Sequence, residues 1–155
     1  MTDLFLLTKF HPHFSLDALC RSDTAEKHGI RNACPEHLLP NLVKLSQLLG
    51  QIESLFSGHR LKLHSGFRSE AVNQRVGGTN SSQHCLGLAA DFTCPGFGTP
   101  RQVAEKIARS GLEYDQLILE YDRWVHISTA EGKKPTRNQI LSINSNTNGY
   151  QTGLV

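Results

Sequence analysis

Three side chains of this sequence have the types and spacing of a catalytic metal site. His84 and Asp91 lie seven positions apart with Gly87 between them, and His126 follows in an aromatic, β-rich segment. Two histidines and one carboxylate are a common ligand set for catalytic zinc, with the fourth position left for water. These residues therefore predict a Zn²⁺ site and a metal-dependent hydrolase. The alternative is a buried polar network without metal, and the spacing alone does not decide between the two.

A hydrolase that cleaves peptide bonds also needs a carboxylate, and Glu120 is the candidate. Such a group takes a proton from water and returns it to the leaving amine. If residues 121–123 form a three-residue hairpin loop, Glu120 pairs with Trp124 and lies on the same strand face as His126. A two-residue loop would put Glu120 and His126 on opposite faces. We predict Glu120 as the base and keep Asp122, at the expected tip of the turn, as the alternative.

Arg68 is the candidate cation for binding a substrate. It lies in the Ser-Gly-Phe-Arg-Ser run of residues 65–69, at an expected strand-to-helix turn. A guanidinium there can bind a substrate carboxylate through two hydrogen bonds or donate to a carbonyl oxygen. The simpler interpretation is a surface ion pair at the start of a helix, which the spacing alone favours.

The elements that must position these side chains follow from capping signals and periodicity. Ser15 and Ser69 are N-cap residues for short helices, and Thr99 followed by Pro100 starts a longer one. After Pro35, apolar residues recur at spacings of three and four, which predicts a long amphipathic helix. Short apolar or alternating runs predict strands over 61–64, 88–93, 114–120, 124–129 and 139–143.

Together these elements predict one α+β domain over residues 1–155. We expect N-terminal helices packed on a small antiparallel sheet that carries the site. The core is expected to span about residues 14–143. The tail, residues 144–155, is rich in Asn, Ser, Thr and Gly and is expected to fray.

The composition is that of an ordinary soluble globular protein. Of the 155 residues 38% are hydrophobic and 19% are charged, and the formal net charge is only +2, which argues against a disordered chain and a nucleic-acid partner. No run of about 18 apolar residues occurs, so we expect no membrane insertion. The N-terminus lacks the basic segment and apolar run of a signal peptide, so we expect synthesis in the cytoplasm. The length suggests a monomer.

The four cysteines form no C-x-x-C pair, which argues against a structural zinc knuckle. Free thiols are the expectation in a reducing compartment. Cys85 and Cys94 bracket the segment that ends at Asp91, so a disulfide between them, formed after release into an oxidising space, is the alternative.

Taken together, the motifs resemble those of the zinc DD-peptidase family of metallopeptidases, which includes zinc D-Ala-D-Ala carboxypeptidases and phage endolysins. The S-x-H-x-x-G-x-A-x-D element of that family is matched by Ser82, His84, Gly87, Ala89 and Asp91. Its W-x-H element is matched by Trp124 and His126, and its S-G-[YF]-R-S element by residues 65–69. Residues 72–73, 76–78 and 81–84, and the opening segment 14–19, resemble a branch of short members often found in phages and prophages. The resemblance runs from about residue 14 to residue 143.

The resemblance implies a hedgehog/DD-peptidase-like fold with zinc on His84, Asp91 and His126. It implies that Arg68 and Ser82 hold the substrate and that Trp124 lines the cleft. In several relatives the catalytic glutamate lies three positions before the last histidine, where this chain has Arg123. The branch that this chain resembles instead carries Leu-Ile-x-Glu, as in residues 117–120, which agrees with the hairpin argument for Glu120.

The function implied is zinc-dependent cleavage of peptidoglycan stem peptides. The bond is either the terminal D-Ala–D-Ala bond, as in a carboxypeptidase, or an internal bond such as L-Ala–D-Glu, as in an endopeptidase. The expected setting is a phage or prophage endolysin that is made in the host cytoplasm and acts on the cell wall. The alternative from another class is a non-catalytic, zinc-containing module that binds the wall or builds a virion.

Overall fold

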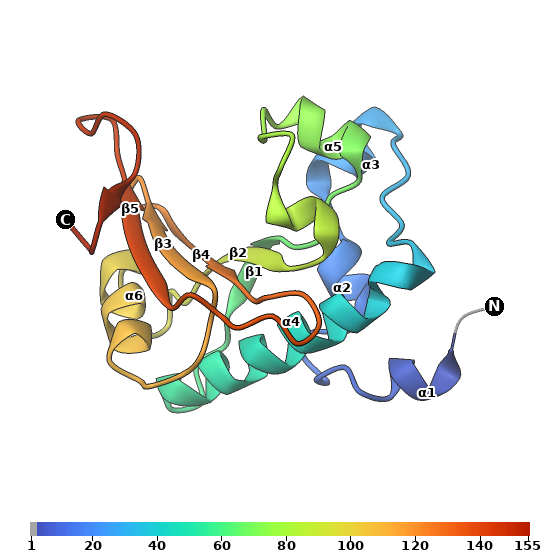
Figure 1. The fold of residues 1–155 in the computed structure, drawn as a ribbon, viewed down its shortest axis with the longest axis horizontal. Helices are drawn as coiled ribbons and strands as arrows, with labels where there is room; N and C mark the ends of the chain where they lie inside the picture. The colour runs from blue at the N-terminus through green and yellow to red at the C-terminus, as the bar shows by residue number, and fades with distance from the viewer. Residues whose placement is uncertain (1–2) are drawn as a thin grey trace.

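The six strands of the described residues form one mixed sheet across the middle of the molecule in this computed structural model, which describes residues 3–155 (Figure 1). Their order in the sheet is β1-β2-β4-β3-β5-β6. The strands are β1 (Lys62–Ser65), β2 (Ala89–Thr93), β3 (Gln116–Glu120), β4 (Trp124–Ser128), β5 (Gln139–Ile143) and β6 (Gln151–Thr152). The α+β fold of a single domain is as predicted.

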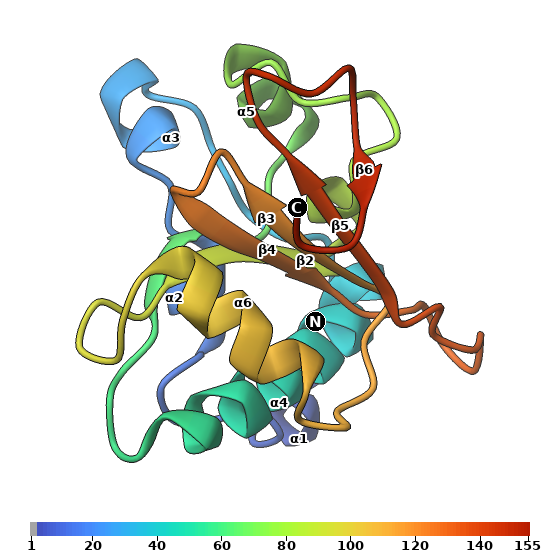
Figure 2. The same cartoon turned by 90° about the vertical axis from the view of Figure 1, so that its left-hand side faces the viewer.

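The longest helices lie on one face of the sheet, and the shorter α3 and α5 lie toward the other side (Figure 2). The α-helices are α1 (Leu4–Leu7), α2 (Leu16–Cys20), α3 (Asp23–His28), α4 (Leu39–Glu53), α5 (Glu70–Arg75) and α6 (Pro100–Ala108). Three 3₁₀ helices of the described chain are η1 (Glu36–Leu38), η2 (Ser54–Phe56) and η3 (Gln83–Leu86). None of the helices in residues 3–155 is long and apolar enough to span a membrane.

Side-chain caps start the helices where the sequence predicted. The hydroxyl groups of Ser15 and Ser69 accept hydrogen bonds from the first turns of α2 and α5. Thr99 and Gln102 form a reciprocal capping box at the start of α6. Because these bonds satisfy backbone N–H groups that a helix leaves without partners, they fix the residue at which each helix begins.

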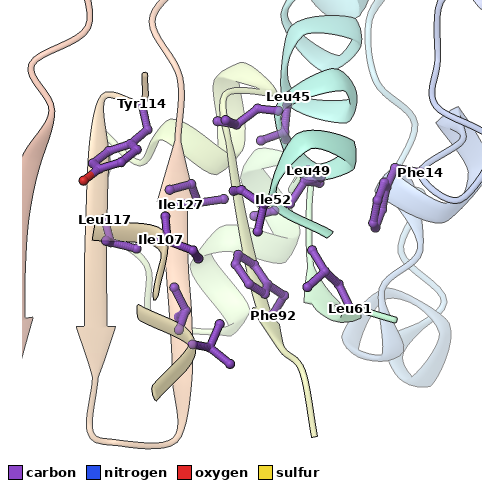
Figure 3. Close-up of a cluster of buried hydrophobic side chains, with 14 of the residues drawn as sticks. Phe14, Leu45, Leu49, Ile52, Leu61, Phe92, Ile107, Tyr114, Leu117 and Ile127 are labelled. Carbon is purple, nitrogen blue, oxygen red and sulfur yellow. The ribbon is translucent and has the colours of Figure 1, made fainter. Parts of the chain in front are cut away.

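The core lies between the sheet and the two long helices (Figure 3). Phe92, Leu117 and Ile127 point from the sheet toward Leu49 and Ile52 of α4, and all five side chains are fully buried. Each such side chain contributes about 1.5–3 kcal/mol when it is removed from water. Because successive side chains of a strand point to opposite faces, the polar residues next to these apolar ones face the other side.

The β3–β4 hairpin has the predicted three-residue loop. Glu120 pairs with Trp124, and residues 121–123 make the turn between them. Tyr121 and Asp122 adopt φ angles of 56° and 53°, which close the turn. Glu120, Trp124 and Ile118, the partner of His126, therefore lie on one face.

The sheet is antiparallel as predicted except at one pair, because β5 runs parallel to β3. Both edges of β4 are paired, with β2 and β3, so β5 cannot pair with β4 and instead adds to the other edge of β3. The connection over residues 129–138 carries the chain back before it enters β5, which gives β3 and β5 the same direction.

The tail also differs from expectation, since residues 151–152 form β6 and pair with β5. The amide of Gly153 donates to the carbonyl of Ile140 at 2.8 Å, and Arg101 donates to the carbonyls of Leu154 and Val155. All four cysteines carry free thiols in this structure, so the alternative Cys85–Cys94 disulfide is not formed.

Candidate metal centre and substrate cleft

His84, Asp91 and His126 meet on the open face of the sheet, opposite the core. Asp91 in β2 lies directly across from His126 in β4 in the antiparallel register, and His84 enters from η3. Asp91 Oδ1 lies 3.0 Å from His126 Nδ1, and Asp91 Oδ2 lies 3.3 Å from His84 Nε2. The three groups offer one ligand atom each within 4.8 Å of one another.

A backbone contact orients the ring of His84. Its Nδ1 lies 2.8 Å from the carbonyl oxygen of Gly66 and donates to it, so the proton is on Nδ1 and the lone pair of Nε2 faces the centre. Gly87 ends η3 at a φ of 72°, which turns the chain from His84 into β2. Burial lowers the pKa of His84, so the imidazole is neutral, as a metal ligand must be.

The negative charge of Asp91 also suits a metal ligand. Although burial acts to raise the pKa of Asp91, the adjacent His84 and His126 hold it below its usual range. The carboxylate is therefore ionised between two imidazole rings whose centroids lie 5.2 Å apart.

These donors fit a zinc ion. Ligand atoms of a tetrahedral zinc site with bonds of roughly 2 Å lie about 3.3 Å from one another, close to the two observed separations. Nε2 of His84 is buried and makes no hydrogen bond of good geometry within residues 3–155. A buried nitrogen without a hydrogen bond is costly unless another group, such as a metal, uses its lone pair.

Glu120 faces this centre and Asp122 does not. Glu120 Oε1 lies 3.9 Å from His126 Nδ1, and its side chain is only 18% exposed. Burial raises the pKa of Glu120, and the nearby charge of Asp91 acts in the same direction. Asp122 is 53% exposed and pairs with Arg101 at 3.1 Å. Of the two predicted candidates, Glu120 has the position of a proton carrier.

A cleft of about 610 Å³ surrounds the centre. The residues predicted as ligands, first-choice base or substrate contacts all line it, namely Arg68, Ser82, His84, Asp91, Glu120, Trp124 and His126, whereas the alternative base Asp122 does not. The sequence therefore identified residues that the fold brings together from β2, β3, β4 and the two loops before β2.

Family comparison agrees with this centre. A sequence model of the Peptidase M15 family matches residues 12–128, which include the three candidate ligands and Glu120. The chain belongs to this family. M15 proteins are metal-dependent peptidases, so the resemblance to zinc DD-peptidases is confirmed and the chain is a metallopeptidase with a peptide substrate. A search of curated proteins found no match.

Arg68 reaches the M15 cleft from a tightly held loop. Its amide donates to the carbonyl of His84 at 3.1 Å. The side chain of Asn32 donates to the carbonyl of Phe67 and accepts from the amide of Ser69, at 3.0 and 2.7 Å. The Nε of Arg68 is buried and makes no hydrogen bond with the described residues. The loop therefore fixes the backbone around a guanidinium that still has a free donor.

Ser82 has a structural role within the cleft. Its hydroxyl accepts a hydrogen bond from the amide of His84 at 3.3 Å and caps η3. Trp124 forms part of the cleft wall, and its ring packs against Tyr121 with centroids 5.9 Å apart.

Sequence reasoning missed an ion pair that supports the centre of this M15 peptidase. The buried carboxylate of Asp115 accepts from Arg137 Nη2 at 2.7 Å and from Gln83 Nε2 at 3.0 Å. Gln83 precedes His84, so the pair joins the connection after β4 to η3. The hydrogen bonds from Arg137, with that from Gln83, lower the pKa of Asp115. No sequence motif predicts this contact, because Asp115 and Arg137 are ordinary charged residues far apart in the chain.

Proposed function

We propose that this protein is a zinc peptidase that cleaves peptidoglycan stem peptides. The observation that carries the proposal is the meeting of His84, Asp91, His126 and Glu120 in one cleft, into which Arg68 also reaches. Zinc would be held by the two histidines and Asp91.

Bound zinc would polarise the scissile carbonyl and activate the attacking water. Glu120 would accept a proton from that water and return it to the amine nitrogen as the C–N bond breaks, leaving a carboxylate on one product and an amine on the other. A raised pKa suits this task, because the carboxyl group must both take up and release the proton near neutral pH.

Arg68 would bind a carboxylate or carbonyl of the stem peptide. Guanidinium groups bind carboxylates through two parallel hydrogen bonds, and the Nε of Arg68 has no other partner among residues 3–155. Ser82 and Trp124, which line the cleft, would contact the bound substrate. Stem peptides carry free carboxylates, which gives Arg68 a matching group.

Two bonds of the stem peptide are candidates for cleavage. A carboxypeptidase would use Arg68 to hold the terminal carboxylate of D-Ala–D-Ala, whereas an endopeptidase would cut an internal bond such as L-Ala–D-Glu. We include in the proposal that the protein serves as a phage or prophage endolysin, which the resemblance of its motifs to short phage members supports.

The proposal is tested by digesting purified peptidoglycan with the protein after chelation and after zinc is restored, with products identified by mass spectrometry. We expect zinc-dependent release of peptides. New N-termini at D-Glu identify an endopeptidase, and loss of terminal D-Ala identifies a carboxypeptidase. Absence of any product while zinc is bound would overturn the proposal and favour the wall-binding module instead.

A further inference from the structure

Tyr150 lines the cleft although it lies outside the part of the chain that the family match covers. The match ends at residue 128, and the β5–β6 hairpin that follows supplies Leu141 and Tyr150 to the same cleft as His84 and Glu120. Figure 2 shows this hairpin beside the open face of the sheet, on the side of α5 rather than of α6. The segment after residue 128 is therefore part of the cleft wall.

The backbone on both sides of Tyr150 is fixed. Gly149, with a φ of 79°, turns the chain just before it, and the next residue, Gln151, pairs with Ser142 of β5. The hydroxyl of Ser142 donates to the carbonyl of Gly153 at 2.8 Å and accepts from the amide of Val155 at 3.2 Å. These bonds hold the backbone next to Tyr150 in place, so its side chain stays at the cleft.

Tyr150 and Arg68 lie toward opposite ends of the cleft. Arg68 follows β1 and Tyr150 precedes β6, and these two strands are the two edges of the sheet. The strands that carry Asp91, His126 and Glu120 lie between them. A peptide that extends from Arg68 across the centre therefore reaches Tyr150 on the far side of the bond to be cut.

The surroundings of Tyr150 favour a neutral substrate group. Its side chain is half-exposed, so the phenol is accessible from the cleft. Asp91 and Glu120 line the same cleft as Tyr150. Arg137, a cation that also lines it, is already paired with Asp115, so a substrate carboxylate at this end meets no free cation of the described chain. A protonated phenol donates one hydrogen bond, which a peptide carbonyl oxygen accepts.

We propose that Tyr150 is a substrate-binding residue whose phenol donates a hydrogen bond to a peptide carbonyl on the side of the scissile bond remote from Arg68. This inference rests on the proposed peptidase function and adds a second point of attachment to it. With Arg68 at one end and Tyr150 at the other, the cleft binds a carboxylate on one side and an uncharged peptide backbone on the other.

The test compares wild type with Tyr150→Phe and Tyr150→Ala on a synthetic stem pentapeptide that contains both the L-Ala–D-Glu and the D-Ala–D-Ala bonds. We expect Tyr150→Phe to raise KM about three- to tenfold with kcat nearly unchanged, because a neutral hydrogen bond to the substrate is lost. Tyr150→Ala should raise KM further. Zinc content and melting temperature should match those of wild type in both variants, which a merely structural role would not allow.

Thr152→Val is the matched control, because it removes a hydroxyl from the same hairpin at an exposed residue that does not line the cleft. Binding of the pentapeptide to the zinc-loaded Glu120→Gln variant, with and without Tyr150→Phe, gives a readout that does not depend on turnover. An active wild type with unchanged KM in both Tyr150 variants overturns this inference alone. A wild type that neither binds nor cleaves the pentapeptide overturns the proposed function and this inference with it.

Discussion

At the scale of single residues, the centre depends on two imidazoles and two carboxylates with different tasks. Asp91 lies between His84 and His126 and is held ionised by them, whereas burial favours the protonated form of Glu120. Two carboxyl groups on one sheet face with pKa values shifted in opposite directions are typical of sites in which one binds a cation and the other moves a proton.

Glu120→Gln should remove most of the peptidase activity and keep the zinc. The amide has nearly the same shape but cannot carry a proton, and such groups contribute about 10²–10⁴-fold to rate. The measurements are kcat on a stem peptide and zinc content of the purified variant. Asp122→Asn is the control and should retain full activity, since Asp122 pairs with Arg101 outside the cleft. If Asp122→Asn were the inactive variant, the assignment of the base would have to be reversed.

At the scale of elements, the centre is assembled by loops that fasten η3 to the sheet. The carbonyl of Gly66 holds the ring of His84, and the amide of the following residue donates to the carbonyl of Leu19 at 2.8 Å. On the other side, Asp115 holds Gln83 and Arg137. Each contact joins a segment next to a candidate ligand to a more distant part of the chain.

Gly66→Ala should weaken zinc binding as well as stability. A Cβ at residue 66 would lie 2.3 Å from the carbonyl oxygen of Leu19, so the loop that positions His84 must shift. Such overpacking costs about 1–3 kcal/mol. Zinc affinity would be measured by competition with a chromogenic chelator. The control is Ile107→Val in α6, which costs about 0.5–1.5 kcal/mol far from the centre and should leave the affinity unchanged. Equal affinities in the two variants would contradict the role of the Gly66 carbonyl.

Asp115→Asn should destabilise the protein in a pH-dependent way. The charged hydrogen bonds to Arg137 and Gln83 would be weakened, at a cost of about 2 kcal/mol near neutral pH. Since the folded pKa of Asp115 lies below its ordinary value, this contribution is complete above about pH 4 and is lost as the pH falls through the folded pKa. The measurement is urea unfolding of the metal-free wild type and the metal-free Asp115→Asn variant between pH 7 and pH 2. The difference between their free energies of unfolding should become smaller as the pH falls. A difference that stays constant down to the lowest pH would argue against the ion pair.

At the scale of the whole molecule, the candidate metal centre connects the central strands of the sheet to the segments between β1 and β2. The helix η3, the loop after β1 and strands β2 to β4 all contribute to it, so a ligand bound there stabilises contacts between segments far apart in the chain. The helices α4 and α6 cover the opposite face and complete the core.

Zinc should therefore raise the melting temperature of the metal-free protein. A ligand that binds only the folded state adds about 2.7 kcal/mol at 100 times its Kd, which corresponds to about 5–10 °C for a domain of this size. Thermal unfolding with a chelator and with added zinc measures the shift. Asp91→Asn is the control and should show almost no shift. A wild-type shift no larger than that of Asp91→Asn would contradict zinc binding at this centre.

Local signals in the sequence were enough to predict most of the short elements and the candidate residues that the fold brings into one cleft. Capping residues fixed the starts of α2, α5 and α6, and the choice of a three-residue loop was enough to place Glu120 opposite Trp124. These features depend on neighbours in the chain, so their signals lie in short stretches of sequence.

Contacts between distant segments could not be predicted from the sequence. The parallel pairing of β5 with β3, the ion pair between Asp115 and Arg137 and the position of Tyr150 on the cleft all join segments that are far apart in the chain. Residues that are neighbours only in the folded structure show no shared pattern or fixed spacing in the sequence. The cleft wall beyond residue 128 therefore became visible only when the folded chain brought it beside His84 and Glu120.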